Sequence, residues 1–535
     1  MAGSGGIGPR APRLPGTTGI VAGVTFLLVL AVYRATMLPG VGAWDTAEVQ
    51  TVPPLLGTMH PTGFPAFVVL GWIANLLLAP FGEPAFRMTL LTGILSALAA
   101  GLAVFVFRRL GAPALLAGAA AVGFALTPIA WHIGVSADVH ALHVALLVVI
   151  TLGLLRWEAA VRDARERPDD EGLGRRADRR LVGTAAVFGM SAANHGLTLL
   201  LVPAIGLFVV AVDAAVFRRP RLVLAAVGVA AGLAALLYLE LPLRAGVFPA
   251  PQVYGHPETL QGLLDTVLAR QFQGDVSGGD PGTRIGALWA LASNQLGPLA
   301  LLVVPAFVVT ALRHPRYALY SGVAVVITCA FAANYENARI DRYYLGPLFF
   351  AWSWLAGAAG VVADRMLAAV DTDQTRDGSR RGPASPGIDP VRAGLALVLG
   401  LALLVPTGVG LRDRWVQQDL SRSTMAPQWL DQAFAALAED AVVISWWSYS
   451  TPLWYGTLIE GRRPDITIVD DRTRLDEGLG EVTDVIEANL DRRPVYLIRL
   501  TEADVDALRG RYTVEAVGQP GNLFRVTGRA ETPTP

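Results

Sequence analysis

The sequence predicts a mostly α-helical, polytopic membrane protein of about eleven transmembrane helices with a small C-terminal α/β domain outside the membrane. Hydrophobic residues make up 53% of the 535 residues and charged residues only 16%, against about 25% charged residues in ordinary soluble proteins. Apolar runs long enough to cross about 30 Å of hydrocarbon recur as far as residue 411, and the mean hydropathy is +0.46. The lipid bilayer is therefore an expected partner.

Charge and cysteine content exclude some classes of function. The formal net charge is −1, so the chain lacks the basic field that displaces phosphate counterions, and we expect no nucleic-acid partner. All 43 basic residues are Arg, which is typical of a GC-rich bacterial genome. Cys329 is the single cysteine and lies in an apolar run, which rules out an intrachain disulfide and a cysteine-based metal site.

The expected spans follow the apolar runs in chain order. Residues 1–16 form an N-terminal tail, and the membrane domain covers residues 17–411. We expect spans at 17–37, 87–107, 112–130, 140–156, 181–193, 196–217, 222–243, 297–312, 317–335, 343–363 and 392–411. Because the run 181–193 is short for a membrane crossing, the expected number of eleven spans could differ by one or two.

Arginine sets the expected orientation, because basic residues stay preferentially on the cytoplasmic side. All the arginine clusters fall on one side if the apolar stretch 64–80 lies in the outer interface and does not cross. The clusters are Arg10 and Arg13, Arg108 and Arg109, Arg156 to Arg180, Arg218 to Arg221, Arg313 to Arg316, and Arg376 to Arg392. We therefore expect a protein of the cytoplasmic (inner) membrane with a cytoplasmic N-terminus and outer loops at 38–86 and 244–296.

The C-terminal segment 412–535 is expected to be an extracytoplasmic α/β domain. Strand-like runs at 441–445, 465–469 and 495–500 alternate with helix-like runs at 428–438, 482–490 and 502–508, as in small α/β folds. The segment is also rich in aromatic residues, namely Trp446, Trp447, Tyr449, Trp454 and Tyr455. We interpret these as a domain core or a membrane-docking face in preference to a sugar-stacking surface.

Ionisable residues gather at the outer ends of the expected helices. Asp45 and Glu48 follow the first span and precede His60, where a membrane enzyme could meet a lipid-borne substrate. Further polar residues expected on that side are Asp138, His140, His195, Arg244, His256, Asp341 and Arg342. A transporter would usually carry such residues near the bilayer midplane.

Several short motifs in this order resemble one known family. They are Asp45-Thr46-Ala47-Glu48, His60-Pro61-Thr62-Gly63-Phe64-Pro65, Phe86-Arg87, Ser136 to Leu142, Ala193-Asn194-His195, Leu241 to Ala245, Trp454-Tyr455 and Arg463-Pro464-Asp465. The chain resembles the protein O-mannosyltransferase-like members of the GT-C superfamily. It departs from their pattern at Ala47, Thr62, Phe64, Asp138 and His140, where Gly, Pro, Tyr, Glu and Tyr are usual.

The resemblance implies a GT-C-type membrane glycosyltransferase. Such an enzyme would take a sugar, with mannose one candidate, from a polyprenyl-phosphate carrier on the outer face and pass it to an acceptor hydroxyl of a protein or an envelope glycan. Two alternatives stay open: a flippase or exporter of lipid-linked sugars, and a non-catalytic envelope scaffold.

The chemistry of glycosyl transfer suggests a role for each candidate residue. An inverting single displacement needs a carboxylate that accepts the acceptor's proton while the leaving phosphate is stabilised. Asp45 is our candidate base, with Glu48 on the same helical face. No cofactor is required by the sequence, and a divalent cation shared by Asp45, Glu48 and Asp138 is left open.

The candidate substrate-binding residues fall into two groups. His60, Asp138 and His140 are expected to contact the sugar or its phosphate, although His60 also fits an ordinary loop histidine whose hydrogen bonds are satisfied. Asn194 and His195 join them because they interrupt an apolar stretch, where buried polar groups need partners. Arg87, Arg244 and Arg342 are candidates to neutralise the lipid phosphate, since guanidinium matches phosphate bidentately. Asp341 beside Tyr343 and Tyr344 fits either a binding role or an interfacial belt.

Overall fold

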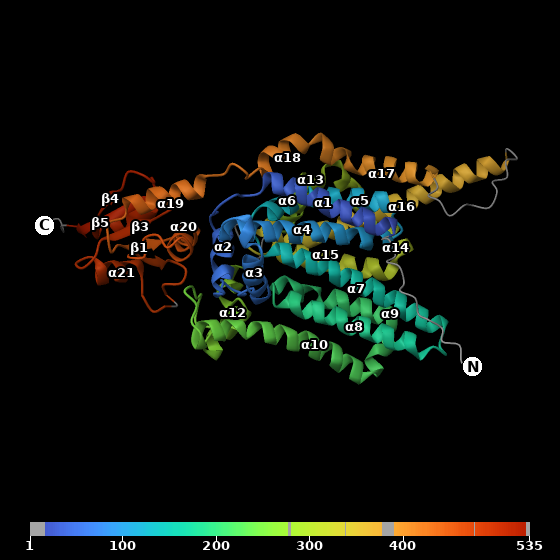
Figure 1. The fold of residues 1–535 in the computed structure, drawn as a ribbon, viewed down its shortest axis with the longest axis horizontal. Coiled ribbons are helices and arrows are strands. Elements are labelled where there is room, and N and C mark those ends of the chain that lie inside the picture. The colour runs from blue at the N-terminus through green and yellow to red at the C-terminus, as the bar shows by residue number, and fades with distance from the viewer. Residues whose placement is uncertain (1–15, 276–279, 337–338, 377–389, 476, 531–535) are drawn as a thin grey trace, which may run out of the picture.

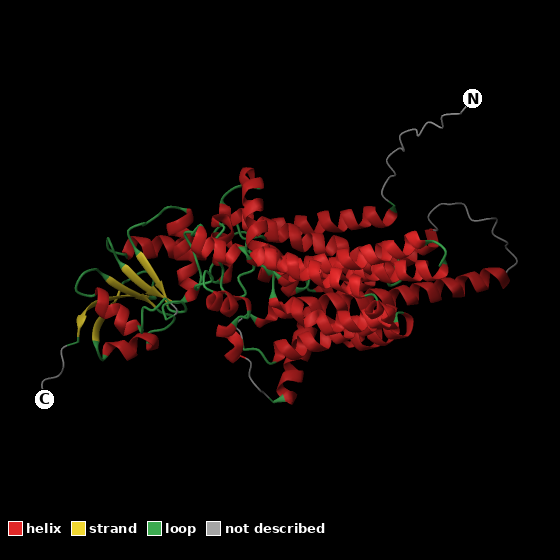
Figure 2. Ribbon diagram, turned by 90° about the horizontal axis from the view of Figure 1, so that it is seen from below, coloured by secondary structure: helices red, strands yellow, loops and turns green. Residues whose placement is uncertain are grey.

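A computed structural model describes residues 16–530 except 276–279, 337–338, 377–389 and 476. Long helices lie side by side in a bundle, and a sheet flanked by helices lies beyond one end of it (Figure 1). Figure 2 shows the same division from a second side, with all strands at that end. The structure therefore confirms a mostly helical chain with a small C-terminal sheet.

Several helices of the bundle begin at a proline. Proline occupies the first helical position of α4, α6, α10 and α15, where its missing N–H costs nothing. The helices are α1 (Thr17–Thr36), α4 (Pro84–Arg109), α5 (Ala114–Ala125), α6 (Pro128–Val135), α7 (His140–Glu166), α8 (Glu171–Ala192), α9 (Val202–Asp213), α10 (Pro220–Tyr238), α13 (Pro281–Leu296), α14 (Val303–Arg313), α15 (Pro315–Ala333), α16 (Leu345–Arg376) and α17 (Pro390–Val409). Their apolar faces form one continuous core.

Within the described residues, eight helices are long and apolar enough to cross a membrane, or up to ten if each bent pair is one span. The bent pairs are 114–125 with 128–135, at 72°, and 393–409 with 411–418, at 55°. The expected span at 181–193 is the one without a counterpart in this set. It is part of α8, whose first half is rich in arginine.

Helix α8 nevertheless runs back along α7. The ring of His140, at the start of α7, lies 4.6 Å from the ring of His195, just after the end of α8. The two helices pack together and are joined at their other ends by residues 167–170. An antiparallel hairpin of this kind returns the chain to its starting side, so eleven crossings stay our prediction.

Two short helices precede α4 at the sheet end of the bundle. They are α2 (Asp45–Leu55) and α3 (Pro65–Leu77). With 13 residues, α3 is too short to cross a bilayer. Its exposed side chains include Trp72, Ile73, Leu76 and Leu77, which suits the expected interfacial position of residues 64–80.

Arginine gathers at the opposite end of the bundle. Arg109, Arg162, Arg313 and Arg316 line one hollow there, although they come from three separate arginine clusters of the sequence. The grouping agrees with the expectation that the arginine clusters share a side. Which side faces the cytoplasm stays a prediction.

The C-terminal domain contains a five-stranded sheet of order β2-β1-β3-β5-β4. The strands are β1 (Val442–Ser445), β2 (Thr467–Asp470), β3 (Val495–Ile498), β4 (Tyr512–Ala516) and β5 (Leu523–Arg529). β1 pairs in parallel with β2 and β3, and β5 is antiparallel to β3 and β4. The flanking helices are α19 (Met425–Ala436), α20 (Trp447–Trp454), α21 (Val482–Asn489) and α22 (Ala503–Arg509).

The sequence located β1, β2, β3, α19, α21 and α22 within a few residues but gave no sign of β4 and β5. Helix α18 (Leu411–Gln418) packs on α6, so the first residues of the expected domain 412–535 lie against the bundle.

Candidate functional site

A cavity of about 590 Å³ lies where the bundle meets the C-terminal domain. Its walls come from helix ends at that end of the bundle and from the loops between them. The expected site residues that line it are Asp45, His60, Asp138, His140, His195 and Arg342. Residues distant in sequence are thus gathered around one partly open cavity.

Helix α2 presents the two acids. Asp45 is its first residue and Glu48 lies one turn later, where the helix dipole favours negative charge. Left-handed backbone brackets this region, with φ of 57° at Trp44, 50° at Leu56 and 47° at Phe64. Such conformations are costly for these side chains, and they concentrate at functional sites.

Arg342 joins the carboxylates of α2 and of the loop before α7. Its Nη2 donates to Asp45 Oδ2 at 2.9 Å, and its Nη1 donates to Asp138 Oδ2 at 3.4 Å. Asp138 also accepts from the backbone N–H of His140 at 2.8 Å, and its Oδ1 lies 2.7 Å from His140 Nδ1. One guanidinium therefore stands between two carboxylates.

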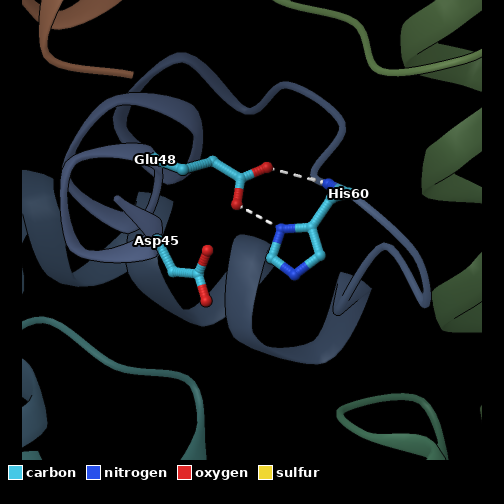
Figure 3. Close-up of side chains that lie close together, drawn as sticks. All are labelled: Asp45, Glu48 and His60. Carbon is cyan, nitrogen blue, oxygen red and sulfur yellow. Dashed lines mark hydrogen bonds and ion pairs between the residues drawn. The ribbon is translucent and has the colours of Figure 1, made fainter. Parts of the chain in front are cut away.

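Glu48 is paired with His60. The Glu48 carboxylate accepts from the backbone N–H of His60 at 2.8 Å, and its other oxygen pairs with the imidazole Nδ1. Figure 3 shows both Glu48 oxygens directed at His60, with the Asp45 carboxylate beside the ring. Glu48 itself is buried, so the pair is shielded from bulk water.

Asp45, Glu48 and His60 could hold a metal ion. Their ligand atoms lie within 4.8 Å of one another, and carboxylates with one imidazole suit a hard or borderline divalent cation. From the sequence, the third ligand of such a cation was expected to be Asp138. In the structure the third residue that lies with Asp45 and Glu48 is His60. Asp138 is separated from them because the positive charge of Arg342 lies between it and Asp45.

The charges around the cavity set the protonation of its carboxylates. Burial alone would raise the pKa of Asp45, but His60 and Arg342 outweigh it and hold the pKa well below its usual range. Burial would likewise raise the pKa of Asp138, but the charges of His140 and Arg342 have the larger effect and lower it. Both groups are therefore ionised at neutral pH.

The pKa values of His60 and His195, two of the histidines that line the cavity, are shifted in opposite directions. Burial would lower the pKa of His60, yet the charges of Glu48 and Asp45 raise it. Burial, together with His140 and His143, lowers the pKa of His195 well below its usual value. His60 is thus favoured as a cation and His195 as a neutral imidazole.

A cluster of rings forms part of the cavity wall. His140 and His195 lie 4.6 Å apart, and Tyr343 lies 5.6 Å and 5.5 Å from them. His140 Nε2 is buried and has no hydrogen-bond partner among the described residues, a state that costs about 1–3 kcal/mol. Asn194 is buried, and its amide donates to Val139 O at 3.3 Å.

Four expected binding residues do not line the cavity, namely Asn194, Arg244, Arg87 and Asp341. Arg244 donates to the carbonyls of Leu56, at 2.7 Å, and Leu55, at 3.4 Å, and so satisfies the end of α2. Arg87 donates to Gly82 O at 2.6 Å, and Asp341 pairs with Arg339 at 3.3 Å. The sequence placed these residues near the correct end, but it could not tell where their side chains point.

The C-terminal domain supplies cavity residues that sequence reasoning missed. Trp447 Nε1 donates to Asp45 Oδ1 at 3.2 Å, and its ring lies 5.6 Å from that of His60. Arg472 also lines the cavity. Trp447 had been interpreted as a core or docking residue, and nothing in the sequence singled out Arg472.

Part of the chain is similar in sequence to known glycosyltransferases. Residues 45–216 match the family described as the N-terminal domain of protein O-mannosyl-transferase TMEM260. The mouse protein O-mannosyl-transferase TMEM260 is 26% identical over 363 residues, which are 65% of this chain and 46% of that protein. The match therefore spans about half the length of the curated relative.

Solved structures share the fold over nearly the whole chain. ArnT from Cupriavidus metallidurans in the apo state aligns with a TM-score of 0.55 and 14% identity, covering 96% of this chain and 98% of ArnT. The archaeal oligosaccharyltransferase AglB from Archaeoglobus fulgidus, in complex with an inhibitory peptide and a dolichol-phosphate, aligns at 0.53 with 15% identity, covering 97% and 75%. At these identities the likeness shows the fold alone.

Proposed function

We propose that this chain, which has a GT-C-type fold and resembles the protein O-mannosyltransferase-like family, is a membrane glycosyltransferase. It would transfer a sugar from a polyprenyl-phosphate carrier to an acceptor hydroxyl on the outer face of the membrane. The observation that supports this proposal is the ionised Asp45 carboxylate, which lines a partly open cavity where a polytopic bundle meets the C-terminal domain.

The reaction would be a single displacement at the anomeric carbon. The acceptor oxygen attacks that carbon and gives its proton to Asp45, while the bond to the phosphate oxygen breaks and its electron pair leaves with the carrier. Asp45 already accepts from Arg342 and Trp447, and a carboxylate has about four lone-pair sites. Room remains for the acceptor hydroxyl.

The low pKa of Asp45 bears on its role as a base. An anion held by Arg342 is a weak proton acceptor until the hydroxyl becomes acidic, which happens late, as the bond to the oxocarbenium-like centre forms. Asp45 would therefore first orient the hydroxyl and then take its proton. Inversion at the anomeric carbon follows from a single displacement.

The surrounding residues fit the binding of a polar donor. His140 offers an unpaired Nε2 among the described groups of the cavity wall, and neutral His195 can donate or accept a hydrogen bond. If a divalent cation binds Asp45, Glu48 and His60, it would screen negative charge on the donor. The donor class is supported by the solved structures, because ArnT has been crystallised with undecaprenyl phosphate.

The acceptor and sugar are proposed from the curated relative. Its name is that of a protein O-mannosyl-transferase, which favours mannose and a protein hydroxyl. An envelope glycan hydroxyl has the same chemistry and remains the alternative acceptor. The arginine-rich end would be cytoplasmic, which puts the cavity and the C-terminal domain outside.

Donor turnover tests the proposal directly. Purified full-length protein would be given polyprenyl-phosphate mannose, glucose or arabinose with a peptide rich in serine and threonine, and release of the carrier followed by mass spectrometry. We expect one donor to be consumed and Asp45→Asn to slow its turnover by about 10²- to 10⁴-fold. Glu83→Gln, an exposed acid at the same end, is the matched control. Donor turnover by Asp45→Asn at the wild-type rate would remove Asp45 from the role of base.

A further inference from the structure

The parallel strands of the C-terminal domain end at the cavity. β1 is followed by Trp447 and β2 by Arg472, and both residues line the site or contact its residues. Ligands of open parallel sheets bind beyond the carboxyl ends of the strands, because the loops there converge. The domain therefore turns the carboxyl ends of β1 and β2 toward the cavity.

Arg472 is held in the cavity by aromatic rings. Its guanidinium carbon lies 4.7 Å from the ring centroid of Trp447 and 5.7 Å from that of Phe272, which belongs to the short helix η5 (Arg270–Asp275) of the outer loop. Stacking of this kind orients a guanidinium without neutralising it. Its N–H groups remain able to bind an anion.

The acids beside Arg472 are committed to other partners. Asp470 accepts from Ser450 Oγ at 2.5 Å and from the backbone N–H of Arg472 at 2.9 Å. Asp471 pairs with Arg499 at 2.8 Å. The turn after β2 is thus built to fix the backbone of Arg472 while leaving its side chain unpaired.

The other arginines of the cavity differ in this respect. Arg342 is shared by Asp45 and Asp138, and Arg339 pairs with Asp341. In the described part of the chain, Arg472 is the cavity arginine without a carboxylate within ion-pair distance. An entering anion would find its free cation there.

We infer that Arg472 binds the phosphate of the donor lipid, so that the C-terminal domain supplies the site for the leaving group. The inference rests on the proposed function. A guanidinium forms charge-assisted, bidentate hydrogen bonds with phosphate oxygens, and these would hold the donor and then stabilise the departing carrier. Because Arg472 is exposed, a free phosphate ion is the other source of the same chemistry.

Binding of the carrier without its sugar tests this assignment. Full-length protein in nanodiscs would be titrated with undecaprenyl phosphate, with undecaprenol, which lacks the phosphate, and with inorganic phosphate. We expect Arg472→Ala to weaken binding of undecaprenyl phosphate by about tenfold or more and to leave undecaprenol binding unchanged. Arg472→Lys should recover part of the affinity, because a point charge lacks the fork geometry.

Arg462→Ala is the matched control. Arg462 also lies over a ring of the same domain, 4.8 Å from the centroid of Phe434, but it pairs with Asp431 and Glu460 away from the cavity. This variant should bind undecaprenyl phosphate as the wild type does.

The outcomes separate the inference from the proposed function. If the wild type binds undecaprenyl phosphate and Arg472→Ala binds it equally well, the assignment of Arg472 is wrong and the proposed function stands. If the wild type binds no undecaprenyl phosphate, both fall. Inorganic phosphate that competes at the same concentration as the lipid would overturn the assignment to a lipid phosphate.

Discussion

Replacing Arg342 by glutamine should destabilise the protein through the two carboxylates that it leaves behind. The guanidinium lies 2.9 Å from Asp45 and 3.4 Å from Asp138, and these side chains are 25% and 6% exposed. Breaking a buried ion pair typically costs about 3–5 kcal/mol, because the remaining charge is uncompensated. Since Asp45 is partly exposed and keeps His60 nearby, we expect the lower figure, about 3 kcal/mol.

The loss should shrink as the pH falls. In the wild type, Arg342 helps to lower the pKa values of Asp45 and Asp138, so the stability from these pairs is present above about pH 4 and is lost on acidification. In Arg342→Gln the pKa of Asp138 rises, so Asp138 becomes protonated at a higher pH than in the wild type. Protonation removes the uncompensated buried charge. The difference in unfolding free energy between variant and wild type should therefore be largest near pH 7.5.

The single cysteine provides the assay. Cys329 is only partly accessible, in α15, and unfolding exposes it to a thiol-reactive fluorophore. The double variant Arg342→Gln/Asp138→Asn should regain part of the lost stability, because the most buried uncompensated charge is gone. Wild-type stability of Arg342→Gln at pH 7.5, or a difference that grows on acidification, would refute the reasoning.

Three further outcomes are expected. Trp447→Phe keeps an aromatic ring but loses the 3.2 Å hydrogen bond to Asp45. Turnover assays should show kcat about tenfold lower, and titration should show that undecaprenyl phosphate still binds. An unchanged kcat would mean that Trp447 is only a packing residue. The pKa of His60 is raised in the folded protein, so the contribution of this residue to stability is complete below about pH 6.5 and is lost as the pH rises through the folded pKa. Chemical unfolding should therefore show His60→Gln more destabilised at pH 6 than at pH 9. The reverse order would contradict the pairing of His60 with Glu48. In a variant without the native cysteine, Arg511→Cys should react with an impermeant maleimide on intact spheroplasts and Asp169→Cys only after lysis, whereas the opposite pattern would invert the orientation.

The sequence predicted the helices well because crossing a bilayer requires long apolar runs, and such runs are visible residue by residue. It also grouped Asp45, His60, Asp138 and His195, since each follows or precedes an apolar run on the same expected side. The sequence could not predict where individual side chains point. Arg244 ends a helix at the correct end of the bundle, yet it serves the carbonyls of α2.

Long-range pairing explains what else was missed. Trp447 reaches Asp45 across 402 residues of sequence and Arg342 reaches Asp45 across 297. Such contacts depend on how a separate domain docks, which no local pattern records. Strands β4 and β5 escaped notice because their alternation is weak and β5 ends in polar residues.

The docking of the C-terminal domain has a genetic consequence. Its contact with the bundle includes the hydrogen bond from the backbone N–H of Ala85 to the Tyr455 hydroxyl, at 3.3 Å. A mutation that loosens this contact would withdraw Trp447 and Arg472 from the cavity while leaving every membrane helix in place. Loss-of-function alleles in the C-terminal domain would then be indistinguishable by phenotype from alleles at Asp45, and compensating mutations would arise on either side of the interface.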